Sequence, residues 1–168
     1  MNIRIARSED LHSIVAIYNQ SINGNRSTAD LTPVRPEDRR GWFAEHTPDK
    51  YPVYVAEIDG VMAGWCSISA YRPGRMALRF TAEISYYIDN AFHRQGIASE
   101  LIRRAIASCG QLQIKNLFAI VLERNEASVR LLEKTGFEKW GCLPRVADFG
   151  GEECGHLYYG MRVWDPAI

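Results

Sequence analysis

The chain begins with an alternating run of apolar and polar residues and then changes to a helical period. The run NIRIA (2–6) predicts a short strand, because successive side chains of a strand point to opposite faces. The stretch 23–32 is polar and rich in helix-breaking residues, so we expect a loop there. Between these two segments, apolar spacing of three or four positions predicts an amphipathic helix, carried by Leu11, Ile14, Val15, Tyr18 and Ile22.

A second helix and a hairpin are predicted next. The helix is expected over 36–46, because its leading proline fits the first turn, where no backbone hydrogen bond is lost. The aromatic residues Trp42 and Phe43 form its buried side. Two apolar runs within 51–70 then meet at Asp59-Gly60, a dipeptide typical of two-residue hairpin turns.

The second half of the chain alternates strands and helices. Continuous apolar runs predict strands, and apolar residues at helical spacing predict the helices between them. The expected elements are a strand at 78–89, a helix at 98–109, a strand at 116–122, a helix at 126–135 ended by Gly136, and strands at 137–143 and 157–164. The full order, β-α-α-β-β-β-α-β-α-β-β, predicts a single mixed α/β domain over 1–168 with a partly antiparallel sheet. The strands on either side of the helix at 98–109 should be parallel.

Composition narrows the classes of function. Lysine plus arginine equal aspartate plus glutamate at 20 each, so the net charge is zero and we expect no nucleic-acid partner. The four cysteines show no metal-ligand spacing, so we expect no metal. No apolar run approaches about 18 residues and no signal peptide is evident. We therefore expect no membrane partner and a cytoplasmic location.

The helix expected at 98–109 begins in an unusual way. The preceding stretch FHRQGIA holds a glycine and donor-rich residues where a helix normally starts with Ser, Thr, Asp or Asn. A helix N-terminus has unpaired N–H groups and partial positive charge, which together favour an anion. Gly96 and the small Ala98 let a ligand approach the backbone, and Arg94 adds a positive charge. These residues predict a phosphate cradle, although neither G-x-x-x-x-G-K-(S/T) nor G-x-G-x-x-G is present.

Two stretches of the chain match motifs of a known family. HRQGIA resembles the loop (Q/R)-x-x-G-x-(G/A), with His93 where that family usually has Gln or Arg. LERNEASVRLLEKTGF resembles the segment N-x-x-(A/S)-x-x-x-(Y/L/H)-x-x-x-G-F. The family is the GNAT superfamily of acyl-CoA-dependent N-acetyltransferases, and the resemblance implies that acetyl-CoA binds as acyl-donor cosubstrate between splayed parallel strands. The CoA-binding residues implied are Tyr86, Tyr87, Ile88, His93, Arg94, Gln95, Gly96, Ile97, Ala98, Ser99, Asn125 and Ser128.

The strand expected at 78–89 narrows the resemblance. Its sequence LRFTAEISYYI is similar to the strand before the CoA loop in the phosphinothricin acetyltransferase branch, with matches at Arg79, Phe80, Thr81, Glu83, Ser85 and Tyr87. That branch acetylates the α-amine of phosphinothricin, methionine sulfoximine or methionine sulfone, which implies a small-molecule amine as partner. The segment DFGGEECGHLYYGMRV lacks the Arg-Trp-x-Asp run usual in the branch, which leaves the acceptor open. A homodimer is expected only by analogy with the family.

Glu83 is the candidate general base. Free amines are mostly protonated near neutral pH, so acetyl transfer requires a group that removes the proton. Glu83 lies mid-strand among apolar and aromatic residues, where burial raises the pKa of a carboxylate toward the useful range. Strand alternation places it on one face with Thr81, Ser85 and Tyr87, although it could instead point to solvent from a half-exposed strand.

Acceptor binding is assigned to the start of the same strand. Arg79 could bind an acceptor carboxylate through its forked guanidinium, or could be a solvated arginine at the edge of the strand. Phe80 and Thr81 would line the acceptor site beside it. Trp65 could form another wall of that site, although aromatic residues on strands, Phe80 included, lie more often in the core. This assignment depends on the resemblance to the phosphinothricin acetyltransferase branch.

Acetyl transfer needs two further groups, one that stabilises the oxyanion and one that protonates the departing thiolate. Backbone N–H groups near Tyr87 and Ile88 would stabilise the oxyanion. Leu132 stands where many relatives have a tyrosine, so the proton for the departing thiolate would come from another tyrosine or from water.

Two alternatives to a small-amine acetyltransferase stay open. A protein N-terminal acetyltransferase would share the fold but would need an open groove for a peptide. A non-catalytic acyl-CoA-binding module would bind acetyl-CoA without turnover.

Overall fold

The structure is a computed structural model that describes residues 1–24 and 26–165. Position 25, within the expected loop at 23–32, and positions 166–168, at the end of the expected domain, lie outside the described residues. Seven strands of the described chain form one sheet in the order β1-β2-β3-β4-β5-β7-β6. Their bounds are β1 Asn2–Ile5, β2 Val53–Ile58, β3 Val61–Ala70, β4 Thr81–Ile88, β5 Asn116–Leu122, β6 Glu138–Asp148 and β7 Glu153–Arg162.

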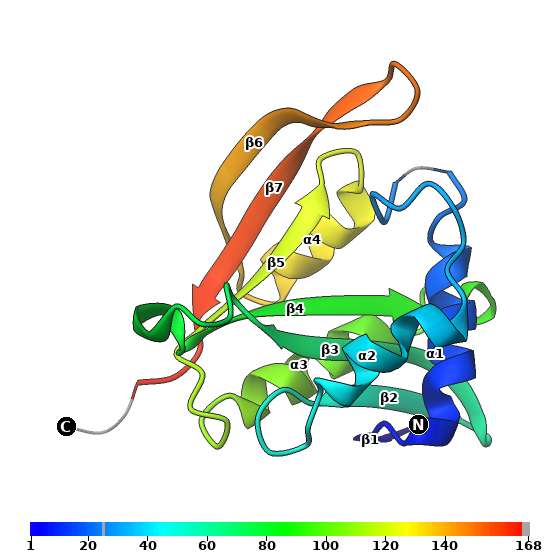
Figure 1. Ribbon diagram of the computed structural model, residues 1–168, viewed down its shortest axis with the longest axis vertical. Coiled ribbons are helices and arrows are strands. Elements are labelled where there is room, and N and C mark those ends of the chain that lie inside the picture. The colour runs from blue at the N-terminus through cyan, green and yellow to red at the C-terminus, as the bar shows by residue number, and fades with distance from the viewer. Residues whose placement is uncertain (25, 166–168) are drawn as a thin grey trace.

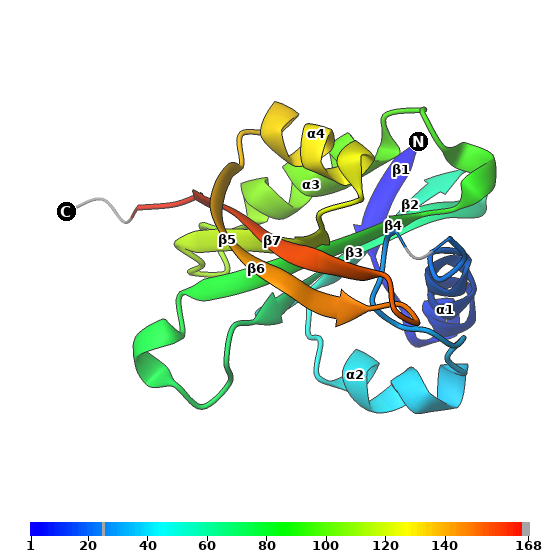
Figure 2. The ribbon, with the colours of Figure 1, turned by 90° about the horizontal axis from the view of Figure 1, so that it is seen from above.

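Helices cover both faces of this sheet (Figure 1). Figure 2 shows α1 and α2 on one side of the sheet and α3 and α4 on the other. Within the described residues, no helix is long and apolar enough to cross a membrane. The bounds are α1 Leu11–Gln20, α2 Arg40–Ala44, α3 Ile97–Ser108 and α4 Glu126–Lys134, with 3-10 turns at Ser8–Asp10, Pro36–Arg39, Met76–Leu78 and Asn90–Phe92. The predicted order of strands and helices is confirmed.

Strand β4 lies in the middle of the sheet and contributes to a core on each face. Ala82 and Ile84 are buried in the main core, which also contains the apolar face of α3. On the opposite face Tyr87 packs against Trp65 of β3, with ring centroids 4.8 Å apart. Because successive side chains of β4 point to opposite faces, the face toward α3 is apolar or aromatic throughout, whereas the other face carries Thr81, Glu83 and Ser85 beside Tyr87.

The predicted parallel pairing of the strands around α3 is confirmed, but it is short. β4 and β5 pair only from Thr81 with Asn116 to Glu83 with Phe118. Beyond this point the two strands diverge (Figure 1), and β4 continues to Ile88 without a strand partner on that side. The divergence leaves an edge of β4 backbone inside the sheet.

Two predicted boundaries around the sheet are corrected by the structure. The strand expected at 78–89 begins only at Thr81, because a 3-10 turn covers Met76–Leu78 and Arg79 has helical backbone angles, φ −59° and ψ −20°. The helix expected over 36–46 is a 3-10 turn followed by the short α2.

The last two strands are longer than the sequence predicts. Strands expected at 137–143 and 157–164 form a hairpin in which β6 extends to Asp148 and β7 begins at Glu153. Gly150 and Gly151 both adopt positive φ in the connecting turn. β6 lies at the edge of the sheet and is exposed along most of its length, so it lacks the alternation of apolar and polar residues that marks a strand.

Candidate active site

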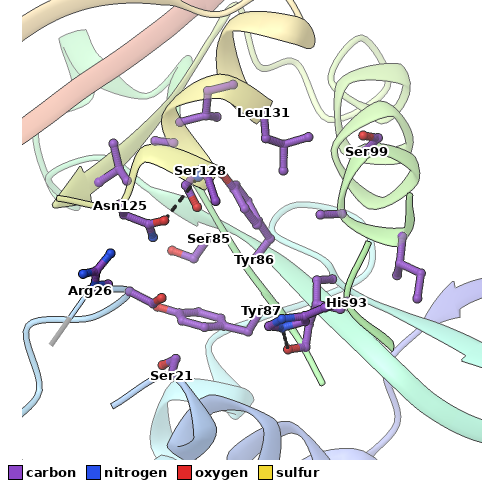
Figure 3. Close-up of a pocket in the computed structure, with 18 of the residues that line it drawn as sticks. Ser21, Arg26, Ser85, Tyr86, Tyr87, His93, Ser99, Asn125, Ser128 and Leu131 are labelled. Atoms are coloured by element: carbon purple, nitrogen blue, oxygen red, sulfur yellow. Dashed lines mark hydrogen bonds between the residues drawn. The ribbon is translucent and has the colours of Figure 1, made fainter. Parts of the chain in front are cut away.

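A large cavity occupies the space where β4 and β5 diverge. Its volume is about 840 Å³, and it is lined by β4, the loop before α3, β5 and the first turns of α3 and α4. Figure 3 shows Tyr86 and Tyr87 projecting from β4 toward different parts of this space. The cavity extends from the middle of the sheet to the N-terminus of α3.

The loop before α3 presents its backbone to the large cavity. Gly96 is the N-cap residue of α3 with φ +80°, a conformation that favours glycine. A Cβ added there would meet no heavy atom within 4 Å, so the space beside Gly96 is open. The ring nitrogen Nε2 of His93 lies 3.1 Å from the carbonyl oxygen of Ile88, which ties the loop to the end of β4 (Figure 3). The first N–H groups of α3 have no partner within the helix and can bind an anion.

The start of α4 forms a second wall of the large cavity. Asn125 caps this helix, because its side-chain oxygen accepts the Ser128 N–H at 3.2 Å (Figure 3). Burial raises the pKa of Tyr86 to about 12, so its phenol stays neutral at physiological pH. Three cations, Arg26, Arg94 and Lys134, also line the cavity. The cavity is long and open, and cations and two helix N-termini border it. It therefore fits an extended ligand that carries phosphates.

A small cavity of about 140 Å³ lies between β3, β4, α1 and the segment that leads into α2. Its walls combine aromatic rings with hydroxyl groups and one guanidinium. Ser85 and Tyr87 line both this cavity and the large one, so the two cavities meet at β4. The small cavity is lined by Ile14, Val15, Tyr18, Arg39, Trp42, Trp65, Ser67, Ser69, Ser85 and Tyr87.

Glu83 lies half-buried on β4, two residues before Ser85 and on the same face. Its neighbours across the sheet are Ser69 of β3 and Phe118 of β5. Burial raises the pKa of the Glu83 carboxyl, as the sequence predicts. Glu83 itself lines neither cavity, although it lies beside Ser69 and Ser85, which line the small one. Its role as a base stays a prediction.

The structure brings together most, but not all, of the predicted CoA-binding residues. Gln95 is exposed in the loop and does not line the cavity. Those that line it are Tyr86, Tyr87, Ile88, His93, Arg94, Gly96, Ile97, Ala98, Ser99, Asn125 and Ser128.

The predicted acceptor residues lie elsewhere. Arg79, Phe80 and Thr81 line neither cavity. The Arg79 guanidinium is exposed, donates to the Met76 carbonyl at 2.9 Å and stacks 4.0 Å from the centre of the Phe80 ring. Because the chain turns at Arg79 before β4 begins, strand alternation cannot carry this side chain to the face of Glu83.

Of the side chains that line the small cavity, sequence reasoning named Trp65 as a possible wall of the acceptor site and placed Ser85 and Tyr87 on the face of Glu83. It gave no acceptor role to the side chains that come from the other segments, Arg39, Trp42, Ser67 and Ser69. Arg39 and Trp42 are three positions apart within the helix predicted over 36–46, which would place them on one side of it. That spacing is the one available signal, and it gives no indication of Ser67 or Ser69 on a distant strand. Within the described residues, no group of three or more His, Cys, Asp or Glu side chains is arranged to hold a metal ion.

Comparison with known proteins identifies a family over most of the chain. Residues 1–138 match the family model described as an acetyltransferase (GNAT) domain. YwnH of Bacillus subtilis (strain 168), whose name gives phosphinothricin acetyltransferase as a provisional activity, is 42% identical over 90% of this chain and 93% of its own length. An L-methionine sulfoximine/L-methionine sulfone acetyltransferase of Pseudomonas paraeruginosa is 30% identical over 86% of this chain and 84% of its own.

Solved structures share the same fold. A phosphinothricin acetyltransferase from Sinorhizobium meliloti in complex with acetyl-CoA has a TM-score of 0.90 at 26% identity and covers 96% of this chain and 88% of its own. A ribosomal-protein-alanine N-acetyltransferase from Brucella melitensis has a TM-score of 0.90 at 29% identity and covers 96% of this chain and 99% of its own. The fold is therefore common to proteins named for small acceptors and for protein acceptors.

Proposed function

The chain belongs to the GNAT acetyltransferases, and from this premise we propose that it transfers the acetyl group of acetyl-CoA to the α-amine of a small amino acid-like acceptor. The observation that carries the proposal is the meeting of two unlike cavities at Ser85 and Tyr87 of β4. The large cavity takes the acyl donor, and the small cavity takes the acceptor. Both substrates are bound together, so the amine attacks the thioester directly.

The donor lies along the backbone edge that β4 exposes after it leaves β5. Its pantetheine arm pairs with β4 as an added strand would, and its pyrophosphate binds the N–H groups at the start of α3. The open space beside Gly96 supports this placement, because a ligand can reach the backbone there. The thioester then lies near Ile88, whose backbone N–H points away from β3 and can stabilise the oxyanion. The Tyr87 N–H points toward β3, as does that of Asp89, which donates to the Ala63 carbonyl at 3.0 Å.

Glu83 takes the proton from the amine, directly or through water. The amine nitrogen bonds to the thioester carbonyl carbon, the carbon–sulfur bond breaks, and CoA leaves as a thiolate. A raised pKa suits the carboxylate of Glu83 to this role, because it makes the carboxylate a stronger base. Burial also raises the pKa of the Tyr87 phenol, which therefore keeps its proton and can donate a hydrogen bond near the reaction centre.

The size of the small cavity favours a small acceptor. Its volume of about 140 Å³ is similar to that of an engineered cavity, about 150 Å³, that binds benzene. The relatives named for phosphinothricin and for methionine sulfoximine or sulfone support a small amino acid-like acceptor. The structural neighbour named for ribosomal-protein alanine supports a second candidate, the N-terminus of a protein, whose first residue alone would enter the cavity.

One assay separates these candidates. The purified protein is mixed with acetyl-CoA, and free thiol is followed with methionine sulfone, methionine sulfoximine, phosphinothricin or peptides that begin with alanine. We expect fast thiol release with the amino acid analogues and slow release with peptides. Release with peptides alone would contradict the small-acceptor proposal. Tight binding of acetyl-CoA without thiol release from any acceptor would support the non-catalytic binding module instead.

A further inference from the structure

The small cavity has one charged residue in its wall. Of the residues that line it, Arg39 alone carries a charge, and the others are aromatic, aliphatic or hydroxyl-bearing. Within the sequence Arg39 is the last residue of the turn that leads into α2, so it approaches the cavity from the side opposite β4. A guanidinium in the wall of a small polar and aromatic space favours an anionic group on whatever binds there, provided that it has N–H donors to spare.

The Arg39 side chain is already oriented. Its guanidinium lies over the ring of Tyr18, 4.9 Å from the ring centre. One nitrogen, Nη2, donates to the carboxylate of Asp30 at 3.2 Å. Tyr18 also donates its hydroxyl proton to Asp30, at 2.5 Å, so the carboxylate holds both side chains in place. A guanidinium has five N–H donors, and its contact with Asp30 leaves others that can bind a second anion.

We propose that Arg39 binds the α-carboxylate of the acceptor and thereby selects free amino acids over peptides. This inference rests on the proposed function, because it assigns a residue to the acceptor site of the same reaction. An α-amine and an α-carboxylate are attached to one carbon, so an acceptor that spans the small cavity reaches both sides of it. Its carboxylate meets Arg39, and its amine meets the junction at Ser85 and Tyr87.

An arginine at position 39 suits carboxylate recognition better than a lysine would. A guanidinium binds a carboxylate with two parallel hydrogen bonds, and its stacking on Tyr18 keeps its plane fixed. The hydroxyl groups of Ser67 and Ser85 lie on the opposite wall and can bind other polar groups of the acceptor. When the acceptor carboxylate binds some of the Arg39 N–H donors, the Asp30 carboxylate still accepts a hydrogen bond from the Tyr18 hydroxyl.

The test compares one acceptor with and without its negative charge. L-methionine sulfone has an uncharged side chain, so its α-carboxylate is its only anionic group, and its α-carboxamide removes that charge with little change in shape. In Arg39→Gln we expect kcat/KM for the sulfone to fall about 10- to 100-fold, the effect of one charge-assisted hydrogen bond. For the carboxamide we expect a change of less than about 3-fold, since no charged contact is lost.

Two further variants make the result specific. Arg40→Gln removes the same charge from the exposed neighbouring position, and we expect both acceptors to be acetylated at the unaltered rate. Arg39→Lys keeps the charge but loses the forked pair of N–H donors. Its kcat/KM for the sulfone should therefore lie between that of the unaltered protein and that of Arg39→Gln. The dissociation constant for acetyl-CoA should stay unchanged in all three.

Three results would overturn the inference. Equal losses for the sulfone and the carboxamide in Arg39→Gln would mean that Arg39 only supports the shape of the cavity. An unaltered rate for the sulfone would mean that another group binds the carboxylate. If the unaltered protein acetylates peptides but neither acceptor of this pair, the proposed function fails and the inference fails with it.

Discussion

The two cavities that meet at β4 differ in the protein groups that would contact a ligand. The large cavity is lined by β4, β5, the loop before α3, the segments 20–23 and 26–27, α3 and α4, and two of these present unpaired backbone groups to it, the edge of β4 beyond Glu83 and the start of α3. The small cavity is walled by side chains from α1, the turn before α2, β3 and β4. A ligand in the first is held by N–H and carbonyl groups that almost every residue carries, whereas a ligand in the second depends on particular side chains. We therefore expect the donor to be shared across the family and the acceptor to be specific to this chain.

The largest expected effect on acetyl-CoA binding comes from blocking the backbone of the large cavity. In Gly96→Trp the indole would occupy the open space beside the loop and prevent the pyrophosphate from reaching the N–H groups of α3. Losing two charge-assisted hydrogen bonds weakens binding at least about 100-fold. The measurement is the dissociation constant of acetyl-CoA by calorimetry.

Gly60 provides a matched control for this substitution. It has φ +79° against +80° for Gly96, and a Cβ at either position meets no heavy atom within 4 Å. Gly60 lies in the hairpin turn between β2 and β3 and does not line either cavity. Gly60→Trp should therefore carry similar backbone strain but bind acetyl-CoA normally. Native affinity in Gly96→Trp would show that the pyrophosphate does not bind at this loop.

The next prediction concerns catalysis beside the junction between the cavities, at Glu83, two residues before Ser85 on the same face of β4. Glu83→Gln removes the proposed base while keeping the shape of the side chain, so kcat should fall about 100- to 1,000-fold. In the unaltered protein the rate should rise with pH through the raised pKa of Glu83, because a base must be deprotonated to act. The variant should lose that rise. A pH profile of kcat/KM that is the same in both proteins would remove Glu83 from the reaction.

The same substitution should stabilise the fold. Because burial raises the pKa of Glu83 above its unfolded value, the ionised carboxylate is less favourable in the folded protein than in the unfolded one. Glu83 therefore contributes least to stability when the pH lies above its raised pKa. Glu83→Gln should raise the melting temperature at pH 8 and leave it nearly unchanged at pH 4, below both pKa values, and thermal unfolding at the two pH values checks this. A lower melting temperature at pH 8 would contradict the burial argument.

Local sequence was enough to predict most of the fold and the loop before α3, whereas the other predicted residues of the large cavity came from the resemblance to the family, and the segments 20–23 and 26–27 of its wall were not predicted. The order of elements and the parallel pair around α3 depend on local apolar patterns, and the cradle depends on one glycine before a helix. The small cavity could not be predicted in this way. Its residues lie far apart in sequence, from Ile14 to Tyr87, and only the packing of α1 and α2 on the sheet brings them together.

Errors in the predicted strands have a similar cause. Edge strand β6 is exposed on both faces along most of its length, with Ala147 near its end as its one buried residue, so its sequence carries no burial pattern. The early turn at Arg79 is fixed by contacts of its guanidinium with the Met76 carbonyl and the Phe80 ring, which an apolar pattern does not encode. Periodicity reports burial, and it fails wherever a segment is not half-buried.

Substitutions of Asn125 have a smaller expected effect. They distinguish a residue that supports the wall of the large cavity from one that contacts the bound acetyl-CoA. Asn125→Ala removes the cap of α4 and should cost about 1 kcal/mol of stability, or about 2–4 °C in melting temperature. Asn125→Asp keeps an oxygen that can accept the Ser128 N–H, so it should keep the melting temperature. It also adds a negative charge beside an anionic donor and should therefore weaken acetyl-CoA binding more than Asn125→Ala does. If Asn125→Ala weakened acetyl-CoA binding more than Asn125→Asp does, the Asn125 amide would donate a hydrogen bond directly to acetyl-CoA.

The smallest expected effect is at Arg79, and it sharpens the contrast between the two ends of β4. Its guanidinium is exposed, bound to the Met76 carbonyl and stacked on Phe80, and it lines neither cavity. Arg79→Ala should therefore change KM for methionine sulfone by less than about 2-fold, since exposed contacts of this kind contribute little. Steady-state kinetics beside Arg39→Gln compare the two arginines directly. A large rise in KM for Arg79→Ala, with none for Arg39→Gln, would move acceptor recognition from the small cavity to the turn before β4. The acceptor would then contact a segment that sequence resemblance identifies and local geometry does not.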